Sequence, residues 1–220
     1  DGLVIGLLFQ AMTMNEEIRT ESPMSSKLYH SVQQFLVPML VKAFPNLHPI
    51  RIHPASLTDE PAGGKGVATG FSGGVDSFAS VAQHWANEES PDHKVSHFLF
   101  HNAGSHSTGN HDAARKLFWQ RYETLKPFAE EAGIPFVAVD SNVSELFPID
   151  FIRMHPALNA SVLLVLQQQF GRYYYASTYK YVDCGVSYSD DAARLDPMAF
   201  HMYSTEGLDC VSTCAELSRV

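Results

Sequence analysis

The sequence predicts an α/β protein in which a parallel sheet carries helices on both faces, preceded by a small N-terminal α/β module. Three observations lead to this prediction. The chain has 220 residues and is 45% hydrophobic, which is enough apolar material for a sizeable core. From residue 66 onward, strand patterns alternate with helix patterns, as in parallel sheets with helical crossovers. Residues 57–66 are turn-rich and lack periodicity, so they separate a module of residues 1–60 from a main domain of residues 66–220.

The N-terminal module is expected to contain helices and one short strand. Residues 3–14 are apolar enough for a buried helix or strand, and residues 25–44 place apolar side chains at helical spacing. Pro38 falls inside this second pattern and should kink or split the helix. Residues 48–55 alternate as a short strand does. The sequence assigns no role to residues 1–65, which we expect to serve contacts with a second copy of the chain or with a partner protein.

The main domain is expected to contain five strands that alternate with helices. Two of the helices have clear end signals, because Gly133 and Gly171 follow them. Asn159 is suited to cap the start of the second of these helices. The expected strands are residues 66–71, 95–100, 135–140, 173–181 and 199–203, and the expected helices are residues 77–86, 112–132, 159–170 and from Ser212 onward.

Composition narrows the classes of function. The chain has 15 basic and 24 acidic residues and a net charge of −9, so we expect no nucleic-acid partner. Apolar runs are too short to span a membrane, and three cysteines, Cys184, Cys210 and Cys214, suit a reducing compartment. We therefore expect a cytoplasmic protein with no membrane partner. Because the chain starts without methionine and stops inside an expected helix, we also expect a fragment of a longer protein.

The most informative segment follows the first strand of the main domain and reads SGGVDS. Its glycines let backbone amides approach a ligand without an intervening Cβ, and the helix that follows directs its positive end at the same turn. The serine hydroxyls add further donors. Five fixed positions arise by chance in a chain of this length about once in ten thousand sequences. The pattern therefore predicts a phosphate-binding loop of Ser72, Gly73, Gly74, Val75, Asp76 and Ser77.

At these residues the chain resembles the PP-loop ATP pyrophosphatase superfamily, whose signature is SGGxDS, and is nearest to 7-cyano-7-deazaguanine synthase-like proteins. The resemblance of pattern covers residues 66–220. It implies a Rossmann-like, adenine nucleotide alpha hydrolase-like fold that binds ATP and Mg²⁺. It also implies that ATP is cleaved to AMP and pyrophosphate, which activates a carbonyl or carboxylate of a small-molecule substrate for attack by a nitrogen nucleophile.

The resemblance, together with the positions of residues at the expected strand ends, suggests roles for single residues. Asp76 and Lys180 are the expected catalytic residues, and Asp76 is the expected Mg²⁺ ligand. Lys180 lies at the end of the fourth expected strand, where it can neutralise phosphate charge. His101 and Asn102 follow the second expected strand and would line the adenosine pocket. The expected nucleotide-binding residues are Phe71, Ser72, Gly73, Gly74, Val75, Asp76, Ser77, His101 and Asn102.

Two other functions remain open from the sequence. The chain could be a non-catalytic sensor module that binds a nucleotide and leaves it intact. Residues 70–74 also match G-x-S-x-G, the nucleophile elbow of serine hydrolases, with Ser72 as the nucleophile. Asp190 or Asp196 and then His201 would complete the triad. Against this hydrolase, only one short strand is readable before the motif, and the sequence has no HGGG-type oxyanion segment.

Further polar groups have more than one interpretation. His101, His106 and His111 surround a Gly/Ser-rich loop that could bind zinc, cap the next helix or cover the nucleotide, but their spacing fits no tetrahedral template. Asp190 and Asp191 are either Mg²⁺ ligands or part of a solvated loop. The last two cysteines are separated by three residues rather than two, so zinc is not supported within this chain.

Overall fold

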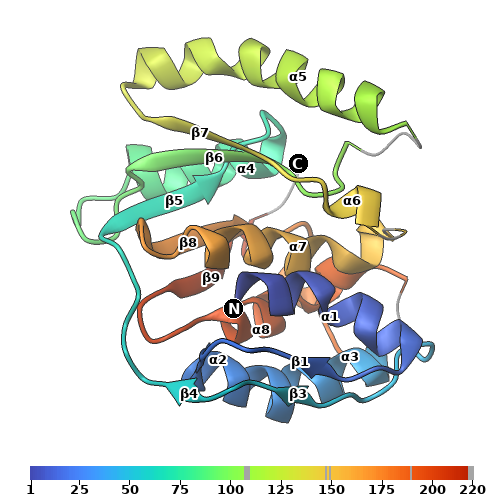
Figure 1. The fold of residues 1–220 in the computed structure, drawn as a ribbon. Helices are drawn as coiled ribbons and strands as arrows, with labels where there is room; N and C mark the ends of the chain where they lie inside the picture. Colours follow the sequence, from blue (N-terminus) through green and yellow to red (C-terminus); the bar gives the residue numbers. More distant parts are fainter. Residues whose placement is uncertain (107–109, 147, 149, 189, 218–220) are drawn as a thin grey trace.

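The centre of the molecule is a five-stranded, all-parallel sheet of order β7-β6-β5-β8-β9 (Figure 1). The computed structural model describes residues 1–106, 110–146, 148, 150–188 and 190–217. The strands are β5 (Gly66–Gly70), β6 (His97–Asn102), β7 (Phe136–Asp140), β8 (Phe170–Ala176) and β9 (Asp209–Thr213). The sheet confirms the predicted α/β class and is compatible with a Rossmann-like fold.

Helices cover both faces of this sheet (Figure 1). One face carries α4 (Val75–Val81), its π-helical continuation η2 (Ala82–Ala86) and α5 (His111–Ala132). The other face carries α7 (Phe151–Val165), against which α1 (Gly2–Met14) packs. Because successive strand residues point to opposite faces, Phe98 and Tyr174 belong to the first core, and Leu99 and Tyr173 belong to the second. No helix of the described residues is long and apolar enough to cross a lipid bilayer.

The strand order reverses between β5 and β8. From β5 the chain passes through α4 to β6 and through α5 to β7, and then returns through α6 (Val143–Leu146) and α7 to β8. Thr69 of β5 therefore pairs with Phe98 on one side and with Tyr174 on the other. In open parallel sheets, ligands bind outside the carboxyl ends of the strands at such a switch point. A ligand site is therefore expected at the carboxyl ends of β5 and β8.

The N-terminal residues pack on the α7 face and share its hydrophobic core. The predicted kink at Pro38 takes the form of a π-helical segment that ends just before the proline. Ser25 caps the start of this helical region, because its Oγ accepts a hydrogen bond from the Leu28 amide at 3.0 Å. The elements are α2 (Ser26–Ser31), η1 (Val32–Leu36), α3 (Val37–Ala43), and the parallel two-residue pairs β1 (Ile18–Arg19) with β3 (Ile52–His53) and β2 (Met24–Ser25) with β4 (Leu57–Thr58).

The start of α7 differs from the prediction. The helix begins at Phe151, after Asp150, so Asn159 lies in its middle instead of capping it. Pro156 interrupts the helical pattern of the sequence, but a helix tolerates a proline where tertiary packing compensates for the lost hydrogen bond. Met154 and Leu158 on either side of this proline are buried in the core. The strand that follows is β8, which begins at Phe170 and ends at Ala176, whereas the prediction was residues 173–181.

The predicted elements after β8 are also wrong. Residues 199–203, expected as the fifth strand, form the 3-10 helix η5 (Phe200–Tyr203), and the fifth strand is instead β9. Ser212, expected to begin a helix, lies within β9. The error arises because alternating burial in a short segment does not distinguish a strand from a single helical turn. The short helices η3 (Tyr181–Asp183), η4 (Ala192–Leu195) and α8 (Asp196–Ala199) complete the connection.

Candidate functional site

Two cavities open at the carboxyl edge of the sheet, one on each side of the start of α4. The first has a volume of about 260 Å³ and lies over β5 and β6, between α5 and α7. The second has a volume of about 300 Å³ and lies beside the segments that follow β8 and β9. Asp76, in the first turn of α4, lines both cavities. Other lining residues of the first cavity include Ser72, Ser77, His101, His106, Arg121 and Tyr175, and those of the second include Val75, Ser177, Thr178, Lys180, Asp183 and Cys214.

The SGGVDS segment forms a tight turn between β5 and α4. Gly73 has a φ of +74°, a backbone conformation that favours glycine. The Gly74 carbonyl accepts hydrogen bonds from the Ser77 hydroxyl at 2.8 Å and from the Phe78 amide at 3.1 Å, which closes the first turn of α4. Ser72 Oγ lies 3.4 Å from the Gly74 amide that donates to it. The loop is therefore shaped by its own hydrogen bonds, and the first amides of α4 lack intrahelical acceptors.

The floor of the first cavity depends on Gly70 at the end of β5. A Cβ at this position would lie 2.7 Å from the Tyr173 hydroxyl of the neighbouring strand β8. The glycine thus allows a tyrosine to lie against the last residue of β5. Tyr173 is buried, and burial raises the pKa of its hydroxyl, so this floor is uncharged.

His101 and Asn159 fix each other's orientation at the wall of the first cavity. The Asn159 amide nitrogen donates to the His155 carbonyl at 2.8 Å, so its oxygen faces His101 Nε2 at 2.6 Å. His101 Nε2 must therefore be the donor. Burial lowers the pKa of His101, which keeps the ring neutral and leaves Nδ1 as an acceptor. Nδ1 is buried and has no hydrogen-bond partner among the described residues.

His106 is a second neutral histidine at the same cavity. Ser105 Oγ donates its proton to the His101 carbonyl at 3.3 Å. The same oxygen can therefore accept a hydrogen bond from His106 Nδ1, which lies 2.9 Å away. Burial, and secondly the charge of Arg121, lower the pKa of His106 to about 4. Its ring packs edge-on against Phe100 and Phe118. Both histidines are thus uncharged at neutral pH and can contact a ligand without adding charge.

A chain of three polar side chains starts at Tyr175, which lines the first cavity. The Tyr175 hydroxyl lies 2.7 Å from His155 Nδ1, and His155 Nε2 lies 3.6 Å from Asp191 Oδ1. The interaction with His155 is the largest of the effects that lower the pKa of Asp191. When Nε2 carries the proton that faces the carboxylate, Nδ1 accepts a hydrogen bond from the tyrosine. The tyrosine hydroxyl, the imidazole and the carboxylate thus lie in a row from the cavity wall to Asp191.

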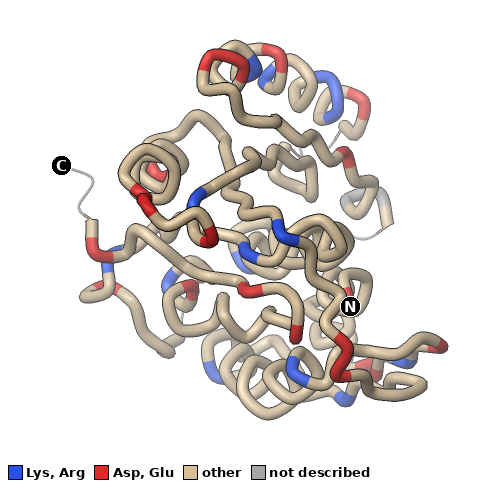
Figure 2. The backbone as a smooth tube through the Cα atoms, turned by 90° about the vertical axis from the view of Figure 1, so that its left-hand side faces the viewer, with Lys and Arg blue, Asp and Glu red and all other residues tan. Residues whose placement is uncertain are grey.

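Lys180 lies beyond Ala176, the last residue of β8, and lines the second cavity rather than the first, which contains Ser72 and Ser77. Within the described part of the chain, no carboxylate lies within ion-pair distance of its ammonium group. Much of the remaining lining is apolar and includes Val75, Ala79 and Leu217. Figure 2 shows that Lys and Arg are interspersed with Asp and Glu over the described trace. Binding of an anion here would therefore depend on a few placed groups.

Three of the expected nucleotide-binding residues have their side chains elsewhere, and one of them, Val75, lines only the second cavity. The Asn102 amide donates to Asp140 Oδ1 at 3.0 Å, toward β7, and Asn102 is not part of the cavity lining. Phe71 contributes to the lining, but its ring is buried in an aromatic core, stacked on Phe98 and Phe128 at centroid distances of 4.9 and 5.1 Å. The phenylalanine therefore anchors the loop to the α5 face of the sheet.

The residues considered for a hydrolase triad lie away from Ser72. Asp190 forms an ion pair with Arg153 at 3.0 Å. Asp196 lines a separate small cavity, whose other lining residues come in part from α1, α3 and α7. His201 is exposed. None of these three residues lines the cavity that contains Ser72. Asp190 and Asp191 are each paired with a side chain of the protein, Arg153 and His155, at a distance from the loop.

The possible zinc ligands are also dispersed. Within the ranges that the structure describes, no three His, Cys, Asp or Glu side chains are grouped closely enough to hold a metal ion. His111 is the exposed first residue of α5. Cys210 and Cys214 are buried and Cys184 is half-buried, and all three are free thiols. Cys214 has a φ of +66° and lines the second cavity.

Several residues of the first cavity were not predicted from the sequence. Arg121 is one of four basic residues on α5, and no local pattern distinguishes it from the others. Tyr173 and Tyr175 have no role expected from the sequence, and Asn159 is expected only to cap a helix. These side chains meet only because α5 and α7 cover opposite faces of the sheet and both reach its carboxyl edge.

Comparison of the chain with family models, with curated proteins and with solved structures finds no match. An assignment of function therefore depends on the residues of the loop and on the geometry of the two cavities.

Proposed function

We propose that this protein is an ATP-dependent adenylating enzyme of the PP-loop type. In this proposal it cleaves ATP to AMP and pyrophosphate and so activates a carbonyl or carboxylate oxygen of a small-molecule substrate. A nitrogen nucleophile then displaces AMP, as in the 7-cyano-7-deazaguanine synthase-like proteins that the loop resembles.

One observation carries the proposal: the SGGVDS loop lies at the switch point of the sheet, between two cavities that meet at Asp76. A glycine-rich turn before a helix is suited to phosphate groups. A switch point is where open parallel sheets bind ligands. The coincidence of the two at one position supports a nucleotide site more strongly than either feature alone.

The two cavities suggest a division between the two substrates. The first cavity would bind ATP, with its phosphates on the loop and its adenosine over Leu99 and His101. The neutral His101 ring suits an uncharged nucleoside. The second cavity would bind the acceptor, with Lys180 opposite its negative charge. The attacking oxygen and the α-phosphorus would then meet beside Asp76, which belongs to both cavities.

The residues beside the loop suit a magnesium ion. Asp76 supplies a carboxylate oxygen, and Mg²⁺ typically takes one or two carboxylates together with phosphate oxygens. The ion would screen the repulsion between Asp76 and the phosphates and would stabilise charge on the pyrophosphate leaving group. Ser72 and Ser77 hold the loop and add hydroxyl groups to the same cavity. A lysine of the Walker type is absent from this loop in the sequence.

The experiment that tests this function is an analysis of products. ATP labelled on the α-phosphate would be incubated with the protein, Mg²⁺ and a pooled small-molecule cell extract as the source of acceptors. The proposal predicts AMP and pyrophosphate, and no activity in Asp76→Asn. ADP and orthophosphate would contradict it. Tight binding of ATP without any cleavage would favour the sensor module instead.

A further inference from the structure

Arg121 lies on the side of α5 that faces the phosphate-binding loop. Leu125, one helical turn later, has its Cδ2 atom 2.5 Å from the position that a Cβ on Gly73 would occupy. Residues four apart share a helix face, so Arg121 also points toward the loop. Because α5 starts at the carboxyl edge of the sheet, Arg121 is one turn nearer to that edge than Leu125. It lines the first cavity together with Ser72 and Asp76.

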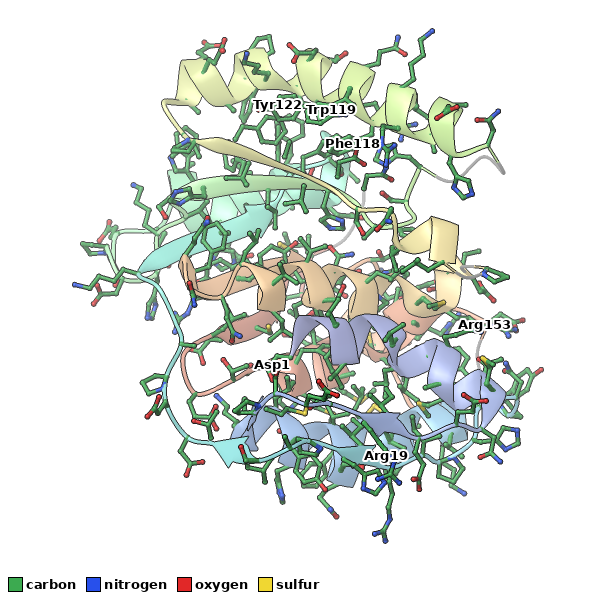
Figure 3. All side chains as sticks on the ribbon, in the orientation of Figure 1. Asp1, Arg19, Phe118, Trp119, Tyr122 and Arg153 are labelled. Carbon is green, nitrogen blue, oxygen red and sulfur yellow. The ribbon has the colours of Figure 1, made fainter. Side chains whose placement is uncertain are left out.

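The neighbouring aromatic residues define which way this helix is turned. Figure 3 shows Phe118 and Tyr122 on the side of α5 toward the sheet. Phe118 stacks on Phe100 of β6 at 5.0 Å, and Tyr122 stacks on Phe136 of β7 at 4.7 Å. On a helical projection, Arg121 and Tyr122 lie on opposite sides of Phe118. Since Tyr122 faces the outer strand β7, Arg121 faces β5 and the loop.

The positive charge of Arg121 is not neutralised by a carboxylate of the described residues. Of the other three Lys and Arg residues of α5, two are paired, since Arg115 contacts Asp140 at 2.8 Å and Lys126 contacts Glu130 at 3.7 Å, whereas Lys116 lies exposed on the opposite side of the helix. The charge of Arg121 also acts on His106 in the cavity wall. After burial, it is the largest effect that lowers the pKa of this histidine. An uncompensated guanidinium at a cavity is suited to bind an anionic ligand.

We infer that Arg121 binds the β- and γ-phosphates of ATP and makes this cavity select nucleoside triphosphates over monophosphates. The inference rests on the proposed function and deepens it. A guanidinium donates two parallel hydrogen bonds to phosphate oxygens, which a lysine cannot do. AMP lacks the β- and γ-phosphates, so it would not reach this contact and would leave the site after reaction.

The same contact would assist the chemical step. An oxygen of the acceptor forms a bond to the α-phosphorus, and the bond from that phosphorus to the bridging oxygen breaks. The electron pair of the broken bond stays on the bridging oxygen, which leaves as part of pyrophosphate. Arg121 and Mg²⁺ would lie beside the group on which this negative charge develops.

Isothermal titration calorimetry with ATP, pyrophosphate and AMP, each with Mg²⁺, tests the inference. Arg121→Gln removes the charge, and Arg121→Lys keeps the charge but removes the paired donors. Lys116→Gln is the matched control, because Lys116 is an exposed cation on the opposite side of the same helix and lines neither cavity. Far-ultraviolet circular dichroism would verify that each variant is folded.

We expect Arg121→Gln to weaken binding of ATP and pyrophosphate by at least about ten-fold and binding of AMP by less than about two-fold. Arg121→Lys should fall between wild type and Arg121→Gln, and Lys116→Gln should match wild type. Unchanged ATP affinity in Arg121→Gln, or an equal loss for AMP and ATP, would overturn the inference while leaving the nucleotide site intact. A wild-type protein that binds neither ATP nor pyrophosphate would instead refute the proposed function, and the inference with it.

Discussion

Leu125 Cδ2 lies 2.5 Å from the position that a Cβ would occupy on Gly73, so the long helix α5 closes over the turn that joins β5 to α4. The glycine satisfies two requirements at once. It adopts a φ of +74°, and it leaves room for the leucine above it. A side chain at this position would therefore strain the backbone and force the end of the Leu125 side chain to move.

The first prediction concerns this contact. Gly73→Ala should weaken ATP binding by about ten-fold or more and destabilise the fold by about 1 to 3 kcal/mol, because it forces a positive φ on alanine and displaces the loop. Titration calorimetry and urea unfolding measure the two effects. Gly133→Ala is the control: its φ is +66°, but open space surrounds the missing Cβ at the end of α5. It should cost about 1 to 2 kcal/mol without changing ATP affinity.

A double variant separates backbone strain from the clash. If Leu125 is the obstacle, Gly73→Ala combined with Leu125→Ala should regain part of the ATP affinity that Gly73→Ala loses. Leu125→Ala alone removes apolar contacts and should lower stability more than affinity. Losses in affinity that simply add would show that the two residues act independently.

The second prediction concerns magnesium. In the wild-type protein, Mg²⁺ should strengthen ATP binding, because the ion relieves the repulsion between the Asp76 carboxylate and the phosphates. In Asp76→Asn this gain should largely disappear, while ATP without metal should bind no more weakly than to wild type. Titrations in MgCl₂ and in EDTA measure the difference. Asp112→Asn is the control, since Asp112 occupies the first turn of α5 and lines neither cavity. A full magnesium effect in Asp76→Asn would place the ion elsewhere.

The third prediction concerns the acid side of the stability profile. The pKa of His106 is lowered from its ordinary value of 6.5 to about 4, so between these pH values the unfolded chain binds more protons than the folded one. The contribution of neutral His106 to stability is complete above about pH 6.5 and is lost as the pH falls toward about 4. His106→Asn does not titrate and can still donate to Ser105. The free energy of unfolding of His106→Asn should therefore fall less steeply than that of wild type as the pH is lowered over this range. Urea unfolding at a series of pH values measures the difference. Identical slopes would contradict the buried, neutral state of this ring.

The fourth prediction concerns Asp196, whose carboxylate oxygens are buried without a hydrogen-bond partner among the described residues. Burial, and secondly the charge of Asp191, raise the pKa of Asp196 well above its usual value. A raised pKa means that stability is lost as the pH rises through the range between the unfolded and folded values. Asp196→Asn removes this titration and should stabilise the protein by about 1 to 3 kcal/mol at pH 8 and by much less at pH 4. A variant less stable than wild type at pH 8 would show that the carboxylate is compensated.

The loop and the sheet class could be predicted from the sequence because both depend on local features. The SGGVDS turn needs glycine at a positive φ, and this requirement is visible in the residue type itself. The strands β5, β6 and β7 alternate with long helices of clear periodicity, and Gly133 ends α5 in the left-handed conformation expected of a capping glycine.

The C-terminal part was harder to predict because tertiary contacts decide it. The pattern of alternating tyrosines continues to Tyr181, but strand β8 ends at Ala176. Beyond it, Ser177 turns the chain by donating its hydroxyl hydrogen bond to the Tyr179 carbonyl at 3.0 Å. β9 was mistaken for the start of a helix, since a five-residue strand carries little periodic signal.

The candidate site was predictable only where one segment supplies it. Ser72, Asp76 and Ser77 come from a single motif, whereas Arg121 and Tyr175 come from elements far apart in the sequence. Their convergence follows from the sheet order and from the rotation of α5 about its axis. Neither property can be read from the spacing of residues along one helix or strand.

A crystal structure of the protein with α,β-methylene-ATP and Mg²⁺ tests the central claim most directly, because this analogue cannot be cleaved between its α- and β-phosphates. The account predicts a nucleotide in the first cavity, with the β- and γ-phosphates against the amides of residues 73–77 and the Arg121 guanidinium, and with the base over Leu99 and His101. A phosphate chain bound elsewhere, or an empty first cavity at a saturating concentration of the analogue, would contradict it.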